Sequence, residues 1–182
     1  MNYSQEGAYF VTIVNKDRQC HFGNVVGEAM QLSLIGRIAQ ECWAAIPKHF
    51  PHAIVDDFVI MPNHVYGIII LNECVGVQHV EPLRHKYQKI IPGSISTIVR
   101  SCKAAVTKAC RENGWGHFQW QRNYLSREIA LANRPAPKEE LSHGMNEHIV
   151  RDDDDLNNIT EYILNNPLQW SLDQENPDRA LA

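Results

Sequence analysis

Two polar side chains lie two residues apart in a stretch that is otherwise apolar. The stretch Asp56–Leu71, DDFVIMPNHVYGIIIL, has two apolar runs around Met-Pro-Asn, and His64 and Tyr66 open the second run. On a β-strand both side chains project from one face, because side chains alternate along a strand. A neutral imidazole there can bind a divalent metal, and a second ligand two residues further would form one edge of the site. Alternatively, His64 hydrogen-bonds the Pro62-Asn63 turn and Tyr66 is an amphipathic core residue.

A second group of candidate residues is the aromatic and polar segment HFQWQRNY, which ends at Tyr124. Its aromatic rings can stack on unpaired bases, and Arg122 can contact phosphates. The hydroxyl of Tyr124 can attack a phosphodiester and form a covalent phosphotyrosine when a cation or metal lies nearby. Alternatively, the segment is an aromatic strand that packs on the sheet.

A third group is found in NEHIVRDDDDL, near the C-terminal end of the chain. Glu147 and His148 can supply a metal ligand or an acid/base group. The four consecutive acids Asp152–Asp155 cannot all face one ion. Acids in the first turn of a helix interact favourably with the helix dipole, so this run indicates a solvated helix start.

Charge is distributed unevenly along the chain. The net charge is −4, but nine Lys or Arg and one acid lie between Arg84 and Arg127, and acids dominate from Glu128 onward. A basic middle in an acidic chain is compatible with a phosphate-binding face or with a solvated helix face.

Length and composition limit the class of protein. A chain of 182 residues with 44% hydrophobic and 21% charged residues suits one globular domain. Five cysteines without a CxxC pair argue against a disulfide framework and favour a reducing, cytoplasmic setting. With no leader-like segment and no apolar run of 18 residues, neither export nor a membrane span is expected.

Hydrophobic periodicity predicts an α+β protein. Two β-branched, aromatic-rich runs around NKDRQ predict a hairpin over Tyr9–Gly27. Helical spacing and Ser94 as an N-cap predict a helix that ends near Gly114. The remaining predictions are a helix over 28–51, a strand pair over 52–71, a long loop over 72–92, an extended segment over 117–124, a helix over 126–133 and helices over 147–166.

This element order predicts an antiparallel sheet with helices packed mainly on one face. We expect one domain over residues 1–170, with an insertion at 125–146, followed by a loose C-terminal tail at 171–182.

Six segments in this order resemble a known family, the one-tyrosine HUH single-strand DNA transposases, and most closely their REP-associated tyrosine transposase (RAYT) branch. They are FVTIVNKDRQCHFG, IPKHFP, VDDFVIMPNHVYGIIIL, IIPGSISTIVRSCKAAVTKACRENG, FQWQRNY and LNNITEYILNNPLQW. The resemblance extends from about Tyr9 to Trp170.

The resemblance implies an RRM/ferredoxin-like fold and a strand transferase that nicks and rejoins single-stranded or hairpin DNA, as a monomer or homodimer. In the family, two histidines on one strand hold Mg²⁺ or Mn²⁺, which polarises the scissile phosphate, and a tyrosine forms a 5′-phosphotyrosine link. His64 matches the first histidine, and Tyr66 stands in the place of the second. Tyr124 is the candidate nucleophile and His148 a completing ligand.

The candidate phosphate contacts are Arg84, Lys86, Arg100, Lys103 and Arg122. Two departures from the family pattern, Tyr66 and the insertion after Tyr124, favour the alternative of an inactive relative that binds hairpin or single-stranded DNA without cutting it. An RRM-like RNA-binding module ranks last, because the basic-aromatic signature of such modules is missing.

Overall fold

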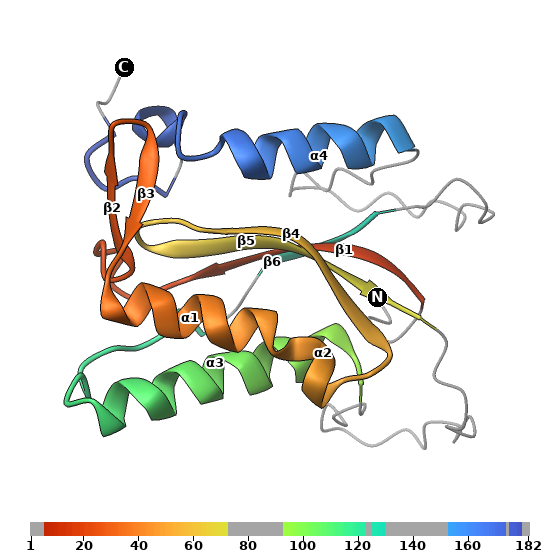
Figure 1. Ribbon diagram of the computed structural model, residues 1–182, viewed down its shortest axis with the longest axis horizontal. Helices are drawn as coiled ribbons and strands as arrows, with labels where there is room; N and C mark the ends of the chain where they lie inside the picture. Colours follow the sequence, from red (N-terminus) through yellow and green to blue (C-terminus); the bar gives the residue numbers. More distant parts are fainter. Residues whose placement is uncertain (1–5, 73–92, 123–124, 130–152, 174, 180–182) are drawn as a thin grey trace.

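The computed structural model describes residues 6–72, 93–122, 125–129, 153–173 and 175–179. The described residues form a sheet with helices on both sides and a separate small hairpin (Figure 1). The elements are β1 (Gly7–Val14), β2 (Gly23–Val26), β3 (Ala29–Leu32), α1 (Leu34–Ala44), α2 (Ile46–His49), β4 (Ala53–Ile60), β5 (His64–Leu71), α3 (Ile95–Glu112), β6 (Leu125–Ile129), α4 (Asp153–Asn165) and the 3₁₀ helix η1 (Trp170–Leu172).

The main sheet is antiparallel and has the strand order β4-β5-β1-β6. Without the β2-β3 hairpin and α2, the chain order β1-α1-β4-β5-α3-β6 is the βαββαβ arrangement of ferredoxin-like folds. The predicted fold class is therefore confirmed. The register pairs Val14 with His64 and Thr12 with Tyr66, which places the start of β5 beside the end of β1.

One face of the sheet is covered by α1 and α3. Ser33 caps α1 by accepting a hydrogen bond from Gly36 N. Ser94 caps α3, as predicted, by accepting one from Thr97 N. The apolar stripe predicted for α3 is buried against the sheet and α1, and it consists of Ile95, Ile98, Val99, Cys102, Val106 and Cys110.

The opposite face of the sheet is covered by α4 (Figure 1). Ile163 of α4 is fully buried against a cluster that includes Phe10 of β1 and Tyr66 and Ile68 of β5. Alternation along β5 thus directs His64 and Tyr66 toward the α4 side, while Val65 and Ile69 point to α1 and α3.

The prediction of a hairpin over Tyr9–Gly27 is wrong. β1 pairs with β5 and β6, and the hairpin of this region is β2-β3, in which Val26 pairs with Ala29. Its two turn residues, Gly27 and Glu28, both have positive φ, 56° and 65°. Positive φ at both positions gives the turn a twist that matches the flanking strands, which explains the tight reversal here.

The prediction of a helix over 126–133 is also wrong for 126–129, the part of this range that the structure describes. Leu125–Ile129 form β6, which pairs with β1 from Thr12↔Leu125 to Ala8↔Ile129. Backbone pairing with a long central strand has outweighed the local helical pattern. The first five residues of the expected insertion therefore belong to the main sheet, whereas 130–146 lie outside the described residues.

The helix predicted over 28–51 is correct only in part, because Ala29–Leu32 form β3 and the remainder is divided into α1 and α2. β4 and β5 form the predicted strand pair, and α4 lies within the predicted helical region. In the described part of the aromatic segment, Trp120 forms an isolated bridge to Asn15. No helix among the described residues is both long and apolar enough to cross a membrane.

Candidate functional site

His64 is the first residue of β5 and is completely buried. Its orientation comes from Asn63, whose Nδ2 donates to the carbonyls of Arg18 (2.8 Å) and Glu175 (2.6 Å). With both amide hydrogens used, Asn63 Oδ1 is left as an acceptor, 2.8 Å from His64 Nδ1. His64 therefore carries its proton on Nδ1, and the predicted hydrogen bond to the turn is present.

The second ring nitrogen of His64 faces a carboxylate. Burial lowers the pKa of His64 to about 3, so the ring is neutral and Nε2 presents a lone pair. Nε2 lies 3.8 Å from Asp173 Oδ2 and has no hydrogen-bond partner among the described residues. Burial raises the pKa of Asp173, whereas a hydrogen bond from Glu175 N to Oδ1 (2.7 Å), the charge of Arg179 and a hydrogen bond from Tyr66 to the carboxylate oppose this effect.

Tyr66 lies next to His64 on the same face of β5, as predicted. The two rings meet edge to face, with their centroids 4.3 Å apart, and the Tyr162 hydroxyl of α4 donates to Tyr66 Oη at 3.4 Å. Burial raises the pKa of Tyr66 far above its ordinary value, so the phenol stays protonated at neutral pH. A neutral phenol is a weak metal ligand, and Tyr66 therefore does not replace the missing histidine.

The C-terminal residues close over His64. The Trp170 ring lies 6.1 Å from the His64 ring, and Arg18 forms an ion pair with Glu175 at 3.4 Å. Asn176 Nδ2 donates to Trp170 O at 2.9 Å. Residues 171–173 and 175–179, which the sequence predicted to be a loose tail, are thus folded back, with Glu175 O accepting from Asn63 of the β4-β5 turn.

Several predicted site residues lie outside the described residues, namely Tyr124, Glu147, His148, Arg84 and Lys86. The roles expected of them, as nucleophile, metal ligands and phosphate contacts, stay predictions. Asp173 and Tyr162, which the structure brings to this site, were missed by the sequence analysis. Asp173 follows no recognisable motif, and Tyr162 was not distinguished from the packing residues of its helix.

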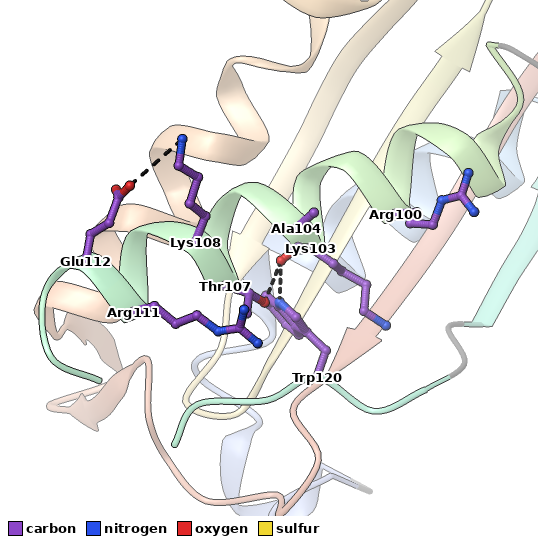
Figure 2. Close-up of a pocket in the computed structure, with 8 residues that line it drawn as sticks. All are labelled: Arg100, Lys103, Ala104, Thr107, Lys108, Arg111, Glu112 and Trp120. Atoms are coloured by element: carbon purple, nitrogen blue, oxygen red, sulfur yellow. Dashed lines mark hydrogen bonds and ion pairs between the residues drawn. The ribbon is translucent and has the colours of Figure 1, made fainter. Parts of the chain in front are cut away.

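A second polar feature lies on α3. A groove of about 430 Å³ is lined by Trp120 and by one face of α3 (Figure 2). Four of the α3 side chains are basic, Arg100, Lys103, Lys108 and Arg111, and one is acidic, Glu112, which forms an ion pair with Lys108 at 3.8 Å. Trp120 Nε1 donates to Lys103 O at 3.1 Å, and Lys103 Nζ lies 6.0 Å from the Trp120 ring centroid. Two of the predicted phosphate contacts, Arg100 and Lys103, are thus placed together, and Arg122 is exposed nearby in sequence.

The groove and His64 lie on opposite sides of the sheet, because α3 packs on one face and His64 points to the other. In the part of the chain that the structure describes, no three His, Cys, Asp or Glu side chains gather around a common point. The described donors near His64 are thus Asp173 and the neutral hydroxyl of Tyr66.

The arrangement of strands and helices in this chain matches that of a solved structure. A solved structure of a REP-associated tyrosine transposase bound to a REP hairpin aligns over 93% of this chain and 72% of its own, with a TM-score of 0.57 and 17% identity. The resemblance noted in the sequence is therefore confirmed at the level of the fold.

The sequence itself has a much closer relative. An uncharacterized protein of Haemophilus influenzae is 39% identical over 177 residues, which cover 95% of this chain and 87% of that protein. The chain belongs to the same family as this protein. No family model matches the sequence.

Proposed function

We propose that this protein binds single-stranded or hairpin DNA and, with a divalent metal, nicks and rejoins it through a 5′-phosphotyrosine link. The observation that carries the DNA-binding part is the basic groove on α3. The cleavage part is supported by the orientation of His64 and by the transposase fold.

The groove has the chemistry that DNA requires. Arg100, Lys103 and Arg111 are spaced along one face of α3, so their charges can follow a line of phosphates. Trp120 is half-buried and offers an aromatic surface beside them, and base stacking on such a surface is worth roughly 1–3 kcal/mol per base. Burial lowers the pKa of Lys103, which lies deepest against Trp120.

The test of DNA binding is a double substitution, Arg100→Gln with Arg111→Gln, measured by mobility shift on a single-stranded oligonucleotide at several salt concentrations. Each lost phosphate contact should reduce the slope of log affinity against log salt by about 0.7. Arg37→Gln with Lys48→Gln is the matched control, because it removes the same charge from exposed positions on α1 and α2. An equal loss in both double variants would reject the groove as the DNA site.

The residues around His64 fit a divalent metal on one criterion. Asn63 fixes the proton on Nδ1, so the buried Nε2 presents a lone pair with no partner among the described groups, as a metal ligand requires. A divalent ion bound there would supply Lewis-acid polarisation of a phosphate oxygen. Under this proposal His64 and His148 hold the ion.

Tyr124 carries the covalent step in this proposal. Its hydroxyl oxygen forms a bond to the phosphorus as the bond from phosphorus to the 3′ oxygen breaks, and that oxygen leaves as a 3′-hydroxyl. The phosphotyrosine keeps the energy of the phosphodiester, so a 3′-hydroxyl can attack it and restore the strand.

The alternative is a relative that binds DNA without cutting it. It is favoured by Tyr66, which offers a neutral phenol where a second histidine would be a ligand, and by the burial of His64 beneath the C-terminal residues.

The two functions differ in one experiment. Labelled hairpin DNA is incubated with the protein and Mn²⁺, and a covalent adduct is sought on a denaturing gel. Cleavage predicts an adduct that is lost in Tyr124→Phe and retained in Tyr162→Phe, which removes the tyrosine hydroxyl near Tyr66. DNA binding without an adduct would support the alternative, and adduct formation by Tyr66→His would then identify the missing ligand as the cause.

A further inference from the structure

The segment that follows β1, residues 15–18, lies between the α3 groove and His64. On one side of it, Trp120 of the groove forms a bridge to Asn15. On the other side, Asn15 N donates to Asn63 O at 3.0 Å, directly before β5. Neighbouring strands lie about 4.7–4.9 Å apart, so two such steps, roughly 10 Å, separate the backbone at Trp120 from the start of β5. Residues 15–18 therefore connect the groove to His64 at this edge of the sheet.

Arg18 has a backbone conformation that is unusual for a residue with a side chain. Its φ is 57°, in the left-handed region that favours glycine. Its carbonyl accepts a hydrogen bond from Asn63 Nδ2 at 2.8 Å, which holds this conformation beside the turn before β5. Residues held in such conformations cluster at active sites and ligand clamps. The presence of arginine at a position that suits glycine therefore points to a task for the guanidinium.

The charges of Arg18 and Lys16 are accessible from solvent. The Arg18 side chain is 52% exposed and lies 3.4 Å from Glu175 Oε2. A guanidinium has five N–H donors, so this ion pair leaves others available to a phosphate. Lys16 is exposed, and its Nζ donates to the neutral amide oxygen of Gln119 at 2.9 Å. Within the described part of the chain Lys16 forms no ion pair.

These two residues extend a row of basic side chains that begins in the α3 groove. Lys103 Nζ donates to Gln121 O at 2.5 Å, and Gln121 N donates to Val14 O at 2.9 Å, directly before residues 15–18. The one acid of residues 15–18 is Asp17, which lies between two cations, so the row keeps a positive charge. A row of cations binds a line of phosphates through release of counterions.

We propose that Lys16 and Arg18 bind phosphates of a single DNA strand that passes from the α3 groove to His64. The inference rests on the proposed DNA-binding function and adds a second set of phosphate contacts to it. It also specifies single-stranded DNA, because the path turns from one face of the sheet to the other within roughly 10 Å. Duplex DNA has a persistence length of about 150 base pairs and does not follow such a turn.

The test uses the variants Lys16→Gln and Arg18→Gly in mobility shifts on a single-stranded oligonucleotide at several salt concentrations. Each variant should reduce the slope of log affinity against log salt by about 0.7, because one phosphate contact is lost. Arg18→Gly also relieves the positive φ, so its Tm should equal or exceed that of the wild type while DNA binding weakens. Arg37→Gln is the control, because it removes the same charge from an exposed position on α1 and should leave the slope unchanged.

Two results would overturn this inference. One is a slope that neither variant changes, or that Arg37→Gln reduces equally. The other is a lowered Tm of Arg18→Gly with an unchanged slope, which identifies a structural role of the arginine. Failure of the proposed DNA binding is distinguishable, because the wild-type protein would then give no mobility shift. A slope that decreases only in the Arg100→Gln, Arg111→Gln double variant rejects this inference and retains the groove.

Discussion

At the scale of the residue, His64 performs two tasks with its two nitrogens. Nδ1 donates to Asn63 and so stabilises the turn before β5, while Nε2 has no hydrogen-bond partner among the described residues and lies 3.8 Å from Asp173 Oδ2. The structural and the metal-binding interpretations of this residue are therefore compatible. His64 and Tyr66 differ in their ability to bind a metal. Burial keeps the Tyr66 phenol protonated, and a neutral phenol is a weak metal ligand.

The buried, neutral state of His64 predicts a pH dependence of the metal-free protein. The pKa falls from 6.5 in the unfolded chain to about 3 in the folded state, so between these values the unfolded chain binds more protons. The free energy of unfolding then rises with pH across this range, by up to about 1.4 kcal/mol per pH unit. This contribution is complete above pH 6.5 and is lost as the pH falls toward 3.

Urea unfolding in EDTA between pH 5 and 7 measures this effect. His64→Gln removes the titrating ring, and its free energy of unfolding should depend less steeply on pH than that of the wild type. Asp173 faces the ring, and its raised pKa acts in the opposite direction at the acidic end, just above 3.8. Identical slopes in the two proteins would mean that His64 is not buried in its neutral form.

At the scale of the element, β5 organises both sides of the molecule. Its even-numbered residues from His64 to Ile68 face α4, and its odd-numbered residues face α1 and α3. Gly67 lies on the second of these faces, where a Cβ would meet the Trp43 ring at 2.6 Å and Phe58 Cβ at 2.8 Å. The large indole of α1 thus occupies the space that a side chain on β5 would need.

Gly67→Ala should therefore destabilise the protein. The added methyl group must displace the Trp43 ring or the β4 backbone, and overpacking of this kind costs about 1–3 kcal/mol. Urea unfolding measures the change. Gly116→Ala is the control, because its Cβ would have no heavy atom within 4 Å and should change the free energy of unfolding little. A stability loss of the same size in both variants would contradict the packing argument.

Helix α3 likewise has two faces with different roles. Its apolar stripe binds the sheet, and its basic residues are thereby directed outward to the groove beside Trp120. The same helical periodicity that builds the core therefore places the candidate DNA contacts in line.

At the scale of the whole molecule, the sheet separates two candidate sites. α3, which lines the groove, lies on one side of the sheet and α4 on the other (Figure 1). His64 points to the α4 side, because it shares a face of β5 with Tyr66 and Ile68. A DNA molecule that contacts both sites must therefore pass around an edge of the sheet.

The second layer, formed by α4, predicts a local loss of stability in Ile163→Ala. Ile163 is fully buried between α4 and the sheet, and truncating such a side chain costs about 2–5 kcal/mol. Hydrogen exchange should accelerate in α4 while α3, on the other face, keeps its protection. Leu164→Ala is the control, because Leu164 is 59% exposed and should behave as the wild type. Equal acceleration in both helices would show that the two layers unfold as one unit.

The sequence alone determined the parts of the molecule that depend on local periodicity. The β4-β5 pair, the buried stripe and Ser94 cap of α3, and the face shared by His64 and Tyr66 all follow from residue spacing along a single element. A resemblance of ordered segments added the fold class.

Tertiary structure alone decided the pairings between distant segments. β6 forms only because β1 offers a free edge, and Asp173 reaches His64 only because the C-terminal residues fold back, with Glu175 and Asn63 bonded across 112 positions of sequence. Neither pairing leaves a periodic signal in the sequence, because each depends on the position of a partner elsewhere in the chain. His64 was thus identified from the pattern of its own strand, whereas Asp173 could be identified as the residue that faces it only from the tertiary structure.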